Sequence, residues 1–249
     1  ESDILTINYE LCQADIDTIT KREDKVMRQI RAMGKDEEKK FIGYRSAVDK
    51  ILPLLQEGKC ARQADLTEEE LAGIYDLHLL TIKPQLFVCN IDEDTISEGT
   101  NKYVETVKKL AAEEKSDVIV ICGKFESDLV EITDPAERKD FMESVGLQES
   151  GLTVLARAAY NLMGLRTYFT GGGDECRAWT FKKGMKAPEC AGVIHTDFEK
   201  GFIRAEVISY EDLIECGSEL KVKEAGKARL EGKDYLMQDG DICHFRFNV

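Results

Sequence analysis

The sequence lacks the marks of several large protein classes. None of its 249 residues lies in an apolar run of about eighteen residues, so no membrane-spanning helix is expected. No basic start followed by an apolar stretch predicts a secretory signal, and the first residue is Glu1 rather than Met, which suggests a fragment or a processed chain. The phosphate-binding pattern G-x-x-x-x-G-K-[ST] is also missing, because every Gly-Lys pair lacks the upstream glycine and the following Ser or Thr. A strong triphosphate site is therefore not expected in this chain.

Positive charge is scarce as well. The chain has 34 basic and 48 acidic residues, a net charge of -14, so no global attraction to nucleic acid is expected, although a local basic patch could still contact RNA. The eight cysteines form no C-x-x-C pair and several lie in apolar runs, which favours reduced thiols in the cytosol over a disulfide framework or a zinc site. The three histidines, His78, His195 and His244, are too scattered to predict a metal site.

The first part of the chain carries two apolar stripes typical of paired helices. The first stripe combines a seven-residue repeat with positions four residues after three of its members: Leu5, Cys12, Ile19, Val26 and Met33, with Tyr9, Ile16 and Ile30. After a turn at residues 34–36, where Asp36 is a candidate N-cap, the 3-4 spacing returns at Phe41, Tyr44, Val48, Ile51 and Leu55. The stripes predict an antiparallel coiled-coil arm that Pro53 shortens, although ordinary bundle helices fit the same pattern.

After the two helical stripes, the spacing of apolar residues changes to continuous runs, which predicts a parallel sheet. Residues 85–89 and 118–122 are continuous apolar runs, and an amphipathic helix around residues 103–111 lies between them. Strand, helix and strand in this order make a βαβ unit, whose strands we expect to be buried. Parallel strands end at the same edge of a sheet, where ligands bind in open α/β folds, and Asn90 and Gly123 follow these two ends.

Helices and short strands fill the rest of the chain. A capping box at Thr67 and Glu70 predicts a short helix, Asp134-Pro135 begins another, and a helix over residues 150–163 closes at Gly164. Beyond residue 166 we expect a small α+β module with a helix over residues 221–230 and a hairpin turn at residues 171–173. Its strands are expected at residues 167–170, 176–181, 203–209, 235–237 and 242–247.

The run Asn90-Ile91-Asp92-Glu93 is the strongest functional motif. An asparagine at the end of a strand, with a carboxylate three residues on, is the arrangement that G-proteins use to grip a purine base. Asn90 can donate and accept hydrogen bonds at a base edge, and Glu93 offers two acceptor oxygens. Four residues alone are a weak signal, and the alternative is that Glu93 is a solvated loop carboxylate.

Longer blocks of sequence resemble one family, the Obg-like ATPases of the YchF type, which belong to the TRAFAC class. The blocks are PQLFVCNIDE at residues 84–93, ICGKFE at 121–126, RAWTF at 177–181 and, most specifically, AGVIHTDFEKGFI at 191–203. The resemblance covers the whole chain and implies the carboxy-terminal portion of such a protein, without its P-loop half. It implies a mixed α/β and α+β fold: a coiled-coil arm inserted in the G domain over residues 1–83, the carboxy-terminal part of the G domain over 84–165, and a β-grasp (TGS) domain over 166–249.

The resemblance also implies a site and a reaction. It assigns base recognition to Asn90, Ile91 and Glu93, and less directly to Cys122, Gly123 and Lys124. It implies hydrolysis of ATP with Mg²⁺, with GTP bound more weakly because a Glu in place of the usual Asp spoils the guanine-specific geometry. The implied protein is cytoplasmic and binds the ribosome or ribosomal RNA, but no membrane and no DNA.

The missing P-loop limits what this chain can do by itself. It holds no catalytic residue and no Mg²⁺ ligand of the family, so we expect weak purine binding at most and no hydrolysis. The alternative from another class is a non-catalytic adaptor that binds ribosomal RNA or protein through the arm and the TGS domain.

A basic patch is the candidate RNA contact of the TGS domain. Around Trp179 and His195, the candidate phosphate-facing cations are Lys182, Lys183, Lys186, Lys200 and Arg204. An ordinary solvated face is the alternative, and a tryptophan is more often a core residue than a stacking platform. His195-Thr196-Asp197 predicts a hydrogen-bonded loop rather than a catalytic histidine.

Overall fold

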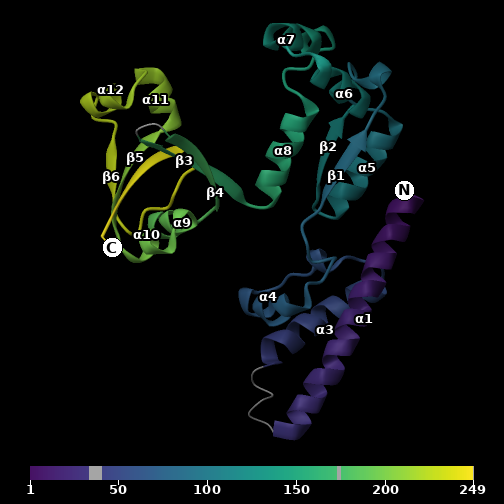
Figure 1. The fold of residues 1–249 in the computed structure, drawn as a ribbon. Helices are drawn as coiled ribbons and strands as arrows, with labels where there is room; N and C mark the ends of the chain where they lie inside the picture. Colours follow the sequence, from purple (N-terminus) through teal and green to yellow (C-terminus); the bar gives the residue numbers. More distant parts are fainter. Residues whose placement is uncertain (34–40, 173–174, 249) are drawn as a thin grey trace. The chain divides into compact units, whose positions relative to one another are not determined.

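The computed structural model describes residues 1–33, 41–172 and 175–248, which form two compact units, Glu1–Leu155 and Ala156–Val249 (Figure 1). Both units contain helices and strands. The helices of the first unit are α1 (Ser2–Met33), α3 (Ile42–Gln56), α4 (Glu68–Ile74), α5 (Lys102–Glu113), α6 (Gly123–Glu131) and α7 (Pro135–Ser144), and its strands are β1 (Leu86–Asn90) and β2 (Asp117–Ile121). Helix α8 (Gly151–Leu162) begins in the first unit and ends in the second. In the described part of the chain, no helix is both long and apolar enough to cross a membrane.

Helices α1 and α3 lie side by side and bury most of the two predicted stripes (Figure 1). The buried members are Cys12, Ile19 and Val26 of α1 and Tyr44, Val48, Ile51 and Leu55 of α3. The prediction is wrong for Leu5 and Tyr9, which are 53% and 54% exposed, because α3 has 15 residues against 32 in α1 and covers only part of it. The turn with Asp36 and the side chains of Ile30 and Met33 lie outside the described residues.

Two buried carboxylates tie this hairpin to the rest of the first unit. Asp15 of α1 accepts hydrogen bonds from the backbone N–H groups of Leu80 (2.7 Å) and Thr81 (2.8 Å). Glu114, at the end of α5, accepts from Asn8 Nδ2 (2.6 Å) and pairs with Arg62 (2.9 Å). These bonds join segments that are far apart in the sequence, so the hairpin and the sheet belong to one packed unit.

The sheet of the first unit is the predicted βαβ unit. Strands β1 and β2 pair in parallel, and α5 connects them. The expectation that both strands are buried is wrong: Val88 is 45% exposed, and only Ile119 of the two strands is buried. The reason is that the sheet has two strands among the described residues, so each has a neighbour on one side only. A separate core, in which Phe125 of α6 stacks on Phe141 of α7 at 4.9 Å, lies beside the strand ends.

The second unit is a five-stranded sheet with helices on both faces. Its strand order is β4-β3-β7-β5-β6, and among the strands formed by the described residues only the β3–β7 pair is parallel. One face packs against α9 and α10, and the other packs against α11 and α12. The elements are β3 (Leu165–Gly172), β4 (Glu175–Lys182), α9 (Ala187–Ile194), α10 (Thr196–Lys200), β5 (Phe202–Ser209), α11 (Tyr210–Cys216), α12 (Glu219–Glu224), β6 (Arg229–Glu231) and β7 (Asp241–Phe247). The β3–β4 pairing confirms the predicted hairpin, but the predicted turn is wrong for Gly171 and Gly172, which pair with Cys176 and Glu175 as the last residues of β3; Gly173 lies outside the described residues.

Two predicted elements of this unit are wrong. Residues 229–231 form strand β6 rather than the end of a helix, because they pair with β5 at Ala205, Glu206 and Val207. Residues 235–237 keep a single bridge, between Lys186 and Leu236, instead of a strand. Two further backbone bonds join them to the start of α9 and the residues before it: Ala187 N–H donates to Tyr235 O (2.9 Å) and Met237 N–H donates to Met185 O (3.1 Å).

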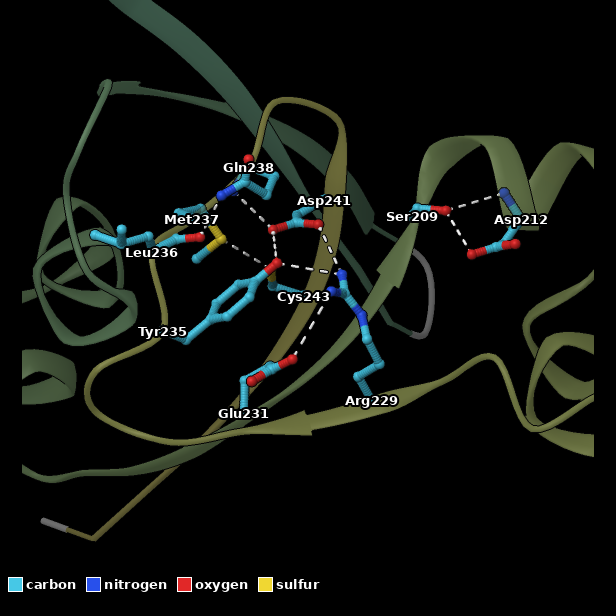
Figure 2. A network of polar contacts seen from close by, with 10 residues as sticks. All are labelled: Ser209, Asp212, Arg229, Glu231, Tyr235, Leu236, Met237, Gln238, Asp241 and Cys243. Carbon is cyan, nitrogen blue, oxygen red and sulfur yellow. Dashed lines mark hydrogen bonds and ion pairs between the residues drawn. The ribbon is translucent and has the colours of Figure 1, made fainter.

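A polar network holds the loop before β7 in place (Figure 2). The carboxylate of Asp241, 1% exposed, accepts from the Tyr235 hydroxyl (2.8 Å) and from Gln238 N–H (2.9 Å), and Arg229 lies 3.4 Å away. Burial raises the pKa of Asp241, while these three partners oppose the shift. The loop that resembles a strand in sequence is therefore fixed by these side-chain bonds together with the few backbone bonds to residues 185 and 187.

Candidate nucleotide-base site

The two predicted recognition loops begin at one edge of the first unit's sheet. Asn90, the last residue of β1, is paired with Ile121, the last residue of β2. Ile91 N–H then donates to Ile121 O at 2.8 Å, so the strands stay together to their ends. Because the strands are parallel, the loop after Asn90 and the helix that starts at Gly123 leave the sheet on the same side.

A side-chain bond joins these two strand ends. Gly123 N–H donates to Asn90 Oδ1 at 2.9 Å. The approach is close, because a Cβ on Gly123 would lie 3.3 Å from the same oxygen. With Oδ1 engaged, the Nδ2 amide of Asn90 is the donor that this exposed side chain can offer to a ligand.

Glu93 and Lys124 are the charged members of the predicted site. Glu93 begins a short 3-10 turn, Glu93–Thr95, and Lys124 lies in the first turn of α6; both are exposed. Lys124 is hydrogen-bonded to Asp128, which raises the pKa of Lys124, and the negative charge of Glu93 adds to the same shift. The two loops are therefore close enough for their charges to interact.

Ile91 and Cys122 contribute differently. Their side chains are 8% and 6% exposed and belong to the core beside the strand ends. Both line a cavity of about 100 Å³ together with Ile96, Phe125 and Glu126. Any contact that these two residues make with a ligand at the exposed edge must therefore come from their backbone.

Sequence reasoning missed two residues next to this edge. Glu126 is 7% exposed, and its carboxylate accepts from Gly151 N–H at 2.6 Å and from Leu152 N–H at 3.3 Å, which are the first residues of α8. Gly151 also packs against β2, since a Cβ there would lie 2.9 Å from Ile121 Cγ2. The available signal was a carboxylate between the buried Phe125 and Leu129, on the apolar face of a short helix.

The candidate RNA contacts are spread over the second unit. Lys182, Lys183, Lys200 and Arg204 are exposed, and Lys186 pairs with Asp234 at 2.8 Å. Lys182 lies on β4 and Arg204 on β5, with β3 and β7 between these two strands. Lys182 and Arg204 therefore lie on strands that are not neighbours in the sheet, and the RNA contact stays a prediction.

The two residues expected at the centre of that patch have structural roles. Trp179 is half-buried against the core, donates to Thr170 Oγ1 (2.9 Å) and carries the Arg177 guanidinium 4.2 Å above its ring. His195 is the N-cap of α10 and accepts from Asp197 N–H at 3.2 Å, so the local hydrogen bond forms, but Thr196 and Asp197 begin a helix instead of the predicted loop. Throughout the two described units, no group of three or more potential metal ligands is assembled.

Comparisons with known proteins give the same family from sequence and from structure. Residues 165–248 match the family YchF-GTPase_C, described as a protein of unknown function (DUF933). Relatives named ribosome-binding ATPase YchF from Bacillus subtilis, Haemophilus influenzae and Escherichia coli O157:H7 are 49%, 47% and 44% identical over 99% of this chain. The chain spans 66% of the length of each.

Two solved structures bear on the fold. The YchF GTPase of Schizosaccharomyces pombe matches 98% of this chain and 65% of its own, with a TM-score of 0.84 and 32% identity. A GTP binding protein of Pyrococcus horikoshii matches 99% of this chain and 71% of its own, with a TM-score of 0.59 and 15% identity, which shows the fold alone. These matches confirm the mixed α and β architecture.

Proposed function

This chain belongs to the YchF family, and on that premise we propose that it carries the base-recognition edge, helical arm and ribosome-contacting module of a cytoplasmic, ribosome-binding ATPase. The arm is the coiled-coil insertion over residues 1–83, and the module is the TGS β-grasp domain over residues 166–249. Residues 84–165 belong to the nucleotide-binding domain. The names of the relatives favour this function over that of a non-catalytic adaptor.

The observation that supports the proposal is the bond between Asn90 and Gly123. It fixes an amide donor at the carboxyl edge of two parallel strands, the place where open α/β sheets bind ligands. Glu93 lies near enough to Lys124 to affect its pKa, so both loops face this edge. A purine ring between these loops meets one amide donor, one carboxylate and one cation.

The chemistry of these groups divides the recognition into two parts. The free Nδ2 donor of Asn90 suits the N7 acceptor, which adenine and guanine share, so Asn90 holds the ring without choosing between the purines. The choice falls to Glu93. Guanine offers N–H donors at N1 and at its exocyclic amine, whereas adenine N1 is an acceptor that a well-aimed carboxylate repels. The longer Glu side chain lies off the geometry that guanine needs, and ATP is then accepted.

The phosphate chemistry needs more than this chain. The sequence has no P-loop, and phosphoryl transfer depends on the P-loop lysine, on Mg²⁺ and on residues that position water. ATP and Mg²⁺ are the cofactors of the proposed whole protein, and the family's Mg²⁺ ligands are not among the residues of this chain. The chain alone therefore binds a purine weakly and does not turn ATP over.

To test the proposal, this chain is fused to the part of the Bacillus subtilis relative that has no counterpart in this chain; we call the product the joined protein. Calorimetry then measures the binding of ATP and of GTP to the joined protein. Asn90→Ala should weaken the binding of both nucleotides by about ten-fold or more, because one or two hydrogen bonds are lost. Glu93→Asp should move the preference toward GTP by a similar factor, while the neighbouring Asp94→Ala serves as the control. Unchanged affinities in the first two variants would refute the assignment of this edge.

A further inference from the structure

Glu126 is the buried carboxylate closest in sequence to the recognition edge. It lies three residues after Gly123 on the same helix and is 7% exposed. Burial of an ionised carboxylate is costly unless hydrogen bonds and nearby positive charge compensate it. The two donors that Glu126 meets are backbone N–H groups, Gly151 at 2.6 Å and Leu152 at 3.3 Å.

These donors are the free N–H groups at the start of α8. The first N–H groups of a helix have no intrahelical partner and carry the positive end of the helix dipole, so a carboxylate is well placed there. The next N–H, of Thr153, is accepted by Ser150 Oγ at 3.2 Å. The start of α8 is therefore capped by a side chain from another helix, α6, as well as by its own preceding serine.

The hydrogen bond between Glu126 and the start of α8 also constrains the first turn of α6. Gly123, at the first position of α6, is held to Asn90 at 2.9 Å, and Glu126, one turn later, is held to α8. Gly151 allows this contact because a Cβ there would lie 2.9 Å from Ile121 Cγ2 and 3.0 Å from Glu126 Oε1. The end of β2 and the start of α6 thus approach the start of α8 so closely at residue 151 that a side chain there would collide with Ile121 or Glu126.

We propose that Glu126 is a positioning residue for the base-recognition edge: its bonds to the start of α8 hold the first turn of α6 so that Gly123 stays in register with Asn90. Glu126 does not touch the ligand. Its importance for nucleotide binding rests on the proposed function, whereas its effect on the Asn90–Gly123 bond does not.

The direct readout is the exchange rate of the Gly123 amide hydrogen, measured by NMR on the chain itself. Glu126→Ala should accelerate this exchange by about ten-fold or more, because the amide is protected by its bond to Asn90. Glu126→Gln should give a smaller increase, since it keeps one accepting oxygen and replaces the other by an NH2 group, which cannot accept from the second N–H. Gly151→Ala retains the carboxylate but forces the contact apart, and should also accelerate the exchange.

The matched control is Asp134→Ala, which removes another helix-capping carboxylate. Asp134 accepts from Ala136 N–H (2.9 Å) and Glu137 N–H (3.0 Å) at the start of α7. This variant should leave the exchange of Gly123 unchanged. Equal acceleration by Asp134→Ala, or no acceleration by the Glu126 and Gly151 variants, would overturn the proposal. If Glu126→Ala does not fold, the exchange rate of the Gly123 amide in Glu126→Gln and in Gly151→Ala still tests the proposal.

A second measurement separates this proposal from the proposed function. In the joined protein, Glu126→Gln should weaken ATP binding several-fold. The control Asp134→Ala should bind ATP with the same affinity as the unsubstituted joined protein. If the unsubstituted joined protein does not bind ATP, the proposed function fails while the exchange result still stands. If ATP binds and Glu126→Gln changes neither the affinity nor the exchange, the positioning role fails and the proposed function survives.

Discussion

Removal of the Glu114 carboxylate should destabilise the first unit more than any surface charge does. Glu114 pairs with Arg62 at 2.9 Å and accepts from Asn8 Nδ2 at 2.6 Å, and the side chains of the ion pair are 10% and 11% exposed. In Glu114→Ala, the guanidinium keeps bonds to Gln85 and to the Thr81 carbonyl, but loses its counter-charge. The Asn8 amide loses its partner as well.

The size of the effect follows from this burial. Loss of one partner of a fully buried ion pair costs about 3–5 kcal/mol, and the remaining exposure and bonds of Arg62 reduce the expected cost to slightly below this range, about 2–3 kcal/mol. The control is Glu143→Ala, which breaks the ion pair between Glu143 and Lys139. Their side chains are 60% and 73% exposed, respectively. That variant should cost less than about 0.5 kcal/mol.

Urea unfolding can measure both variants with an internal reference. The first unit holds the longest helices and therefore dominates the circular dichroism signal, and Trp179, the single tryptophan, reports by fluorescence on the second unit. Glu114→Ala should move the dichroism transition and leave the fluorescence transition in place. The double replacement Arg62→Met with Glu114→Leu should cost less than the sum of its single changes by about 1 kcal/mol or more. A cost for Glu114→Ala no greater than that for Glu143→Ala would refute this reasoning.

Three further outcomes are expected. Hydrogen bonds from Lys50, Ser46 and the Thr67 N–H lower the pKa of Glu70 from 4.5 to about 2. The contribution of Glu70 to stability is therefore present above pH 4.5 and disappears as the pH falls toward 2. Glu70→Gln should flatten this part of the curve of unfolding free energy against pH. Gly73→Ala should lower the melting temperature, because a Cβ would lie 2.5 Å from the Tyr44 nitrogen, whereas Gly232→Ala meets nothing within 4 Å and should be near neutral. Purified chain should hydrolyse no ATP above background in a phosphate-release assay, and turnover abolished by Asn90→Ala would contradict this.

Local patterns in the sequence predicted the elements whose causes are local. The capping box at Thr67 and Glu70 and the cap at Asp134 form as expected, because each involves residues within three positions of one another. The βαβ unit was also predictable, since its strands and helix have distinct apolar periods. For the candidate site, the sequence correctly indicated that Asn90 and Gly123 lie at the same edge.

The features that sequence reasoning missed depend on distant partners. The bond between Asn8 and Glu114 joins residues 106 positions apart, and no period or cap marks either one. Residues 229–231 are a strand because β5 offers them a ladder, whereas their own sequence also suits a helix. The position of Glu126 on an apolar helix face marks it as unusual but does not identify its partner, because the N–H groups that it caps begin a different helix.

The bond from Gly123 to Asn90 has a thermodynamic consequence for any ligand at the strand ends. The two loops are joined before a ligand arrives, so association need not immobilise one loop against the other. Binding at this edge should therefore show little unfavourable entropy from the protein, and calorimetric titrations at several temperatures can measure it.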